Sequence, residues 1–70
     1  MENNYFNSSA LQQGQYNREQ ELLILTFRGN RNYAYNGVNQ AVWEELIRAE
    51  SAGTYYNNFI RGQVPCTPIQ

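Results

Sequence analysis

The 70-residue sequence contains no histidine, no aspartate, no lysine and only one cysteine. A single cysteine excludes a disulfide within the chain, and the missing residue types leave no recognisable set of metal ligands. The usual general bases and activated nucleophiles are absent as well. The adjacent pair Glu44 and Glu45 is no catalytic dyad, because neighbouring residues on a helix point about 100° apart. We therefore predict a non-enzymatic protein without metal or cofactor.

The charge is small and the amide content is high. Five arginines and six glutamates give a net charge of -1, too little positive charge for a channel that follows a long nucleic acid. Ten asparagines, seven glutamines and six tyrosines fit either drift in an AT-rich genome, such as that of many phages, or a polar recognition surface. We find no export signal and no bilayer-spanning apolar run, so we expect no membrane partner. The predicted location is the cytoplasm, that of the bacterial host if the gene is phage-encoded.

A chain of this length forms one domain with a marginal core. We predict a flexible N-terminal segment over residues 1–8, a single domain over residues 9–62 and an extended, proline-containing tail over residues 63–70.

Three stretches have strand character. Residues 10–16 predict a first strand, in which Gly14 indicates a bulge or bend. Residues 21–28 are rich in β-forming residues and are the clearest strand, and residues 31–36 follow after a Gly-Asn turn. The second and third stretches therefore predict a β-hairpin.

Two helices follow. Residues 39–51 carry apolar side chains at helical spacing, with Trp43 expected in the core or in a subunit interface. Gly53 is predicted to end this helix in a left-handed conformation, and Thr54 to cap a second helix through residue 61.

Strands grouped before helices predict an α+β fold, a small antiparallel three-stranded sheet followed by two helices packed on one face. The strand at residues 22–27 is apolar on both faces, with Leu22 and Ile24 on the side opposite Leu23 and Leu25. Something must cover the second face, either the N-terminal segment or another subunit. A homo-oligomer is therefore expected.

A set of short motifs runs from about residue 8 to residue 61: Leu25-Thr-Phe-Arg-Gly29, Tyr33-Ala-Tyr35, Val38, Ala49-Glu-Ser-Ala-Gly53, and Tyr56-Asn57 with Ile60-Arg61. In this order and spacing they resemble the KTSC domain, a small module found at the C-terminus of some lysyl-tRNA synthetases and as stand-alone bacterial and phage proteins. Asn39 and Tyr56 stand where the family usually has proline and phenylalanine, and neither change threatens the fold. The resemblance implies no established activity, although RNA binding has been suggested for the family.

Six residues are candidates for ligand binding, and three of them lie on one strand. Tyr33 and Tyr35 share a face with Arg31, so that tyrosine rings can stack on nucleobases while the guanidinium contacts phosphate. The alternative is that one or both tyrosines pack against the helices.

The other three candidates are Asn57, Arg61 and Arg28. Asn57 and Arg61 are four residues apart and therefore share one face of the second helix, where they can read a base edge and hold a phosphate. Arg28 can join them from the end of its strand. Alternatively, Arg61 is a solvated arginine and Asn57 a capping residue.

The leading functional hypothesis is a nucleotide-binding module, in size and composition like the phage sponge proteins that sequester cyclic dinucleotide signals of antiviral defence. Small net charge favours a compact ligand with few phosphates. The alternatives are binding of short RNA, with a steep salt dependence, and a protein–protein adaptor that ignores nucleotides.

Overall fold

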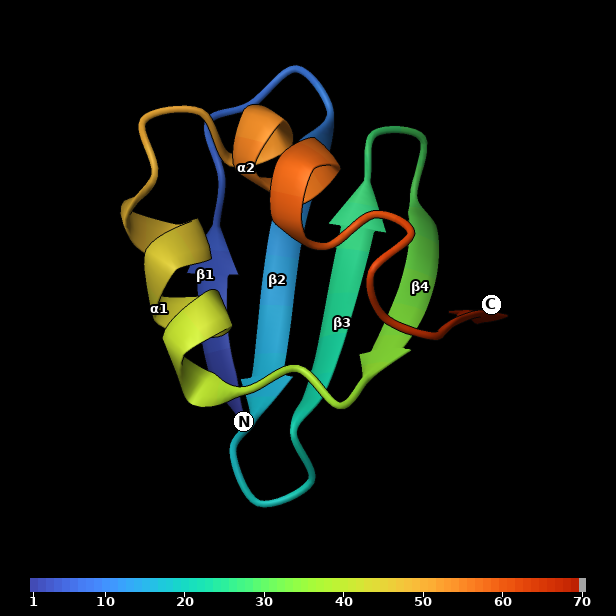
Figure 1. Cartoon of the computed structure of the whole chain (residues 1–70). Coiled ribbons are helices and arrows are strands. Elements are labelled where there is room, and N and C mark those ends of the chain that lie inside the picture. The colour runs from blue at the N-terminus through green and yellow to red at the C-terminus, as the bar shows by residue number, and fades with distance from the viewer. Residues whose placement is uncertain (70) are drawn as a thin grey trace.

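The computed structural model describes residues 1–69 as a five-stranded antiparallel sheet with two helices on one face (Figure 1). The strands lie side by side in chain order, and both helices come between the fourth and fifth strands. The elements are β1 (Glu2–Tyr5), β2 (Leu11–Asn17), β3 (Leu22–Phe27), β4 (Arg31–Asn36), α1 (Gln40–Arg48), α2 (Ala52–Phe59) and β5 (Cys66–Ile69).

The fold is α+β, but the predicted number of strands is wrong, because the sheet has five strands and not three. The two additional strands, β1 and β5, are the edges of the sheet and come from the terminal segments. Their sequences, ENNY and CTPI, show no apolar alternation. Edge strands pair through backbone groups that almost every residue carries, so they need no side-chain pattern. Pro68 is tolerated in β5 because that strand is an edge.

The predicted hairpin is formed by β3 and β4. Leu23 pairs with Tyr35 and Leu25 with Tyr33, so these four side chains share one face of the sheet. Gly29 and Asn30 form the turn with positive φ angles of 91° and 59°. Glycine and asparagine are the residues that enter this left-handed region most readily, which explains the turn.

The first helix begins as predicted, with the Asn39 side chain accepting a hydrogen bond from the Val42 amide at 3.1 Å. It ends earlier than predicted, at Arg48. The second helix is capped by Ser51, whose hydroxyl accepts from the Thr54 amide at 3.2 Å, and not by Thr54 as predicted. Gly53 consequently lies inside α2 and does not end α1. The Ser51 cap starts the second helix three residues early.

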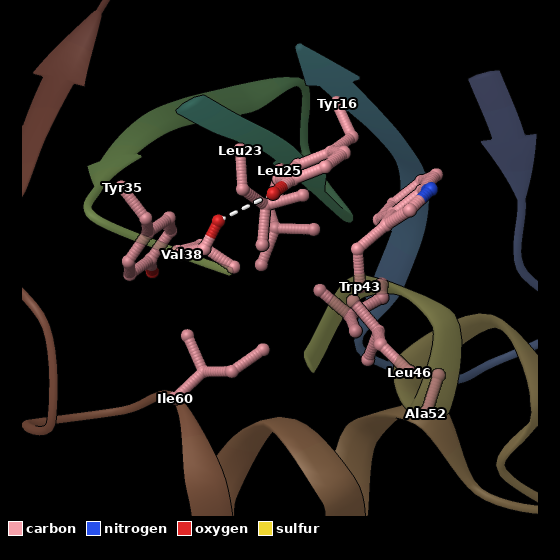
Figure 2. Close-up of a cluster of buried hydrophobic side chains, with 10 residues drawn as sticks. Tyr16, Leu23, Leu25, Tyr35, Val38, Trp43, Leu46, Ala52 and Ile60 are labelled. Carbon is pink, nitrogen blue, oxygen red and sulfur yellow. Dashed lines mark hydrogen bonds between the residues drawn. The ribbon is translucent and has the colours of Figure 1, made fainter. Parts of the chain in front are cut away.

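The core lies between the sheet and the helices (Figure 2) and consists of Leu11, Tyr16, Leu23, Leu25, Tyr35, Val38, Trp43, Leu46, Ala52 and Ile60. Trp43 belongs to it and stacks on Tyr16 with ring centroids 5.5 Å apart. The Tyr16 hydroxyl donates to the Val38 carbonyl, the contact drawn as a dashed line in Figure 2. Burial raises the pKa of Tyr16, so this phenol stays a hydrogen-bond donor at neutral pH.

Both helices of residues 1–69 lie on one side of the sheet (Figure 1), and we call the opposite side the helix-free face. Alternation along the paired strands assigns its residues. They are Asn3, Tyr5, Gln13, Gln15, Asn17, Leu22, Ile24, Thr26, Asn32, Ala34, Asn36, Thr67 and Ile69. The N-terminal segment does not cover this face, because residues 2–5 lie in the sheet as β1.

Candidate functional site

A pocket of about 400 Å³ opens where β4, α2 and the start of β5 meet. Its size lies within the range of about 300–1,000 Å³ that small-molecule sites occupy. We call it the tyrosine pocket. Its lining residues are Ala10, Phe27, Arg31, Tyr33, Tyr35, Gly53, Tyr56, Asn57, Arg61 and Cys66.

Five of the six candidate residues come together in the tyrosine pocket. Strand β4 supplies Arg31, Tyr33 and Tyr35, which alternate onto the helix-covered side of the sheet. Helix α2 and the residues after it supply Asn57 and Arg61, one helical turn apart. Two local patterns that are distant in the sequence thus face the same space.

Aromatic rings form one wall of the pocket. The Phe27 ring meets the Tyr33 ring edge to face at 5.6 Å and the Tyr56 ring at 5.2 Å. Such pairs are worth about 0.5–1.5 kcal/mol beyond the area they bury, so the wall is held in place by its own contacts. Tyr33 is only partly buried and keeps ring surface toward the pocket.

Tyr35 combines the two interpretations made from the sequence. Its ring is core, with 2% of the residue exposed, while its hydroxyl lies 2.7 Å from the Tyr56 hydroxyl. Burial, and then this hydrogen bond, raise the pKa of Tyr35 well above its ordinary value of 10. The phenol therefore stays protonated at neutral pH. Because two hydroxyls share one hydrogen bond, the pair retains one O–H that can donate to a ligand.

The charge of the pocket comes from two arginines. Arg31 and Arg61 line it, and none of the lining residues within positions 1–69 is acidic. Arg61 donates to the Asn57 side-chain oxygen at 3.4 Å, which orients both groups. The ion pairs found within residues 1–69 join Arg18 to Glu2 on β1 and to Glu44 on α1. Both pocket guanidiniums can therefore attract an anion.

Arg28 does not line the tyrosine pocket. It lies in the turn between β3 and β4, and its guanidinium donates to the Ser8 carbonyl at 2.9 and 3.2 Å. The backbone amide of Arg28 also donates to the Ala10 carbonyl, which closes the same contact. Arg28 thus holds the segment between β1 and β2 against the turn.

Phe27, Tyr56 and Cys66 line the pocket but were not predicted as site residues. Phe27 continues the face of Leu23 and Leu25, and Tyr56 directly precedes Asn57, so both carried a sequence signal. Cys66 had no such sequence signal, because only the pairing of β5 with β4 places it beside Tyr35 at the pocket. The lining residues offer hydrogen bonding, stacking and anion contact to a ligand.

A second hollow of about 330 Å³ adjoins the tyrosine pocket and shares Ala10, Gly53 and Asn57 with it. Its other lining residues are Asn7, Ser8, Ser9, Glu50, Ser51 and Thr54. This polar hollow has hydroxyls, amides and one carboxylate, but no arginine. The two compartments therefore differ in charge and lie next to each other beside α2.

Two further properties bear on the chemistry of residues 1–69. No group of three or more metal-ligating side chains lies together in this part of the chain. Neither of its helices has the length and apolar character needed to span a membrane.

The model of the KTSC domain family matches residues 7–63, which include the strands β2 to β4 and both helices. A protein of Tsukamurella paurometabola is 33% identical over 54 residues, which are 77% of this chain and 81% of that protein. The crystal structure of a KTSC domain protein of Yersinia pestis superposes with a TM-score of 0.93 at 25% identity, covering 99% of this chain and 97% of that one.

Proposed function

The chain belongs to the KTSC domain family, and we propose that this member is a non-enzymatic module of the bacterial cytoplasm that binds a small nucleotide in the tyrosine pocket. The observation that carries the proposal is the meeting of Arg31, Tyr33 and Tyr35 with Asn57 and Arg61 around one hollow. This is the combination of aromatic, cationic and amide groups that a nucleotide requires.

Each part of a nucleotide finds a matching group. A base stacked on the Tyr33 ring gains about 1–3 kcal/mol. Arg31 and Arg61 supply charge-assisted hydrogen bonds to phosphate, in the planar geometry that phosphate oxygens accept. The free O–H of the Tyr35–Tyr56 pair and the Asn57 amide provide polar contacts for a ribose or a base edge.

The ligand is compact and not a polymer. Two arginines neutralise about two phosphates, whereas proteins that follow a nucleic-acid backbone present many more cations. The adjoining polar hollow gives room for a second nucleoside next to Asn57. A dinucleotide fits this arrangement better than a mononucleotide, and the cyclic dinucleotide signals of antiviral defence are the ligands we would test first. Sequestration without turnover is the corresponding activity.

Calorimetric titration of the purified protein with mononucleotides, linear and cyclic dinucleotides, and short RNA tests the proposal. We expect a dinucleotide to bind and to be released unchanged on denaturation. Arg31→Ala and Arg61→Ala should each weaken binding by about tenfold or more, the cost of a charged hydrogen bond. Arg48→Ala is the matched control, because Arg48 is exposed on α1 away from the pocket.

Three outcomes would contradict the proposal. Failure of every nucleotide to bind would remove it and favour an adaptor role. Equal affinity of Arg31→Ala, Arg61→Ala and the parent protein would place the site elsewhere. Preference for RNA, with an affinity that falls steeply with salt, would indicate contacts to many phosphates and so the polymer instead.

A further inference from the structure

Among residues 1–69, no charged side chain lies on the helix-free face, and the whole sheet is nearly free of charged side chains. Only two residues in the five strands are charged, Glu2 and Arg31. Both point to the helix-covered side, where Glu2 accepts a hydrogen bond from the Trp43 indole at 3.1 Å and Arg31 lines the tyrosine pocket. Charge is thus excluded from one entire side of the sheet.

This distribution is unusual for a sheet that faces water. Solvated sheet faces carry polar and charged residues, and charges also protect a sheet against unwanted association. Here Ile24 stands on the central strand β3, with Leu22 before it at the start of that strand, and Ala34 lies directly beside Ile24 in the register. Toward the edges, Tyr5 is 74% exposed and Ile69 is 38% exposed. An exposed neutral surface with an apolar centre is typical of a protein interface.

We infer that two copies of the chain associate through their helix-free faces, with the two sheets stacked face to face. In such a twofold arrangement each surface meets its own copy, so any charge would meet a like charge near the axis. A face without charges avoids this repulsion. Its asparagine and glutamine amides both donate and accept hydrogen bonds, which makes them self-complementary.

The area of the face suits a weak dimer. Five strands of four to seven residues, rising about 3.3 Å per residue and spaced about 4.8 Å apart, form a face of about 430 Å². Two such faces bury about 850 Å², an area typical of weak, reversible interfaces. The N-terminal segment leaves the face open, because β1 lies within the sheet. A domain of 70 residues also has a small core and gains stability from association.

This inference is independent of the proposed nucleotide site. The tyrosine pocket lies on the helix-covered side of the sheet, so both pockets of the dimer stay open. Loss of dimerisation and loss of ligand binding are therefore separable by mutation.

Native mass spectrometry and light scattering of the full chain test the dimer. We expect a mass twice the 8.2 kDa of one chain. Gln15→Glu changes one amide to a carboxylate beside Ile24 without changing its shape, and should raise the dimer dissociation constant by at least about tenfold. Gln63→Glu makes the same change on the helix side, after α2, and should leave the dimer intact.

Ile24→Arg is a second variant, which places a cation in the centre of the face. Far-UV circular dichroism shows which variants are folded. Only folded variants are then compared with the parent chain for dimerisation. A monomeric parent chain would overturn the inference. A dimer that survives both Gln15→Glu and Ile24→Arg would also overturn it, because association would then use another surface.

Discussion

Replacing Gly14 by alanine is expected to destabilise the protein, whereas the same replacement at Gly53 is expected to stabilise it. The two glycines receive the same added methyl group, and neither has a positive φ angle. They differ in what the methyl group meets. Gly14 is buried in β2, on the side of the sheet that the helices cover. Gly53 lies in the first turn of α2.

At Gly14 a Cβ atom would lie 3.0 Å from Phe6 Cε2, 3.0 Å from Trp43 Cζ3 and 3.3 Å from Leu25 Cδ2. Trp43 is 1% exposed and stacked on Tyr16, so its ring has no free space into which to move. Overpacking of this kind costs about 1–3 kcal/mol. Alanine regains about 0.5–1 kcal/mol of backbone entropy. The expected net loss of unfolding free energy is therefore about 1 kcal/mol, and at most about 2.5 kcal/mol.

At Gly53 the nearest atoms to an added Cβ would be Ser8 Oγ at 3.5 Å and Ala10 Cβ at 3.7 Å. Both distances are ordinary van der Waals contacts. Alanine is favoured over glycine in a helix by about 0.8–1.0 kcal/mol, and slightly less near a helix end. We therefore expect Gly53→Ala to gain about 0.5 kcal/mol.

Urea denaturation measures both changes. Trp43 is the single tryptophan and lies in the core, so its fluorescence reports loss of the packed state. A change of 1 kcal/mol corresponds to about 4–8 °C in the thermal midpoint of so small a domain. Gly14→Ala should melt below the parent protein and Gly53→Ala above it. If Gly14→Ala is as stable as the parent, the close packing of Phe6 and Trp43 around this glycine is refuted.

Two further predictions concern local contacts. Ser51→Ala removes the cap of α2 and should cost about 1 kcal/mol in a thermal melt, while Ser9→Ala, at an exposed serine outside the helices, should change little; equal effects would argue against the cap. The hydrogen bond from Arg18 holds the pKa of Glu2 below its ordinary value of 4.5, so the carboxylate stabilises the folded chain above that value. This contribution is lost as the pH falls through the lowered pKa. Glu2→Gln should therefore show a weaker loss of thermal stability below about pH 4.5 than the parent protein, and an unchanged acid profile would contradict the Arg18 contact.

Much of the candidate site was predictable from short-range patterns. Alternation places Arg31, Tyr33 and Tyr35 on one face of β4, and helical spacing places Asn57 and Arg61 together. Each pattern sets directions within one element only. Because α2 packs over the side of the sheet to which β4 turns its tyrosines, the two groups meet in one pocket.

Arg28 shows the limit of this reasoning. Arg28 is three residues from Arg31, yet its side chain donates to the Ser8 carbonyl and does not line the pocket. That carbonyl belongs to a residue 20 positions away in the sequence, so no local sequence pattern could predict the contact. The Ser51 cap was missed for another reason. Ser51 and Thr54 are both residue types that favour a helix start, and only the structure shows that Ser51 is the cap.

The sequence by itself determined the hairpin of β3 and β4, the Asn39 start of the first helix and the residues that share one face of β4. These features depend on side-chain period and on turn chemistry, which act over a few residues. Only the tertiary structure decided the edge strands β1 and β5, the turning away of Arg28, and the arrival of Cys66 beside Tyr35. Those features depend on backbone pairing and on contacts between distant segments, which side-chain patterns do not record.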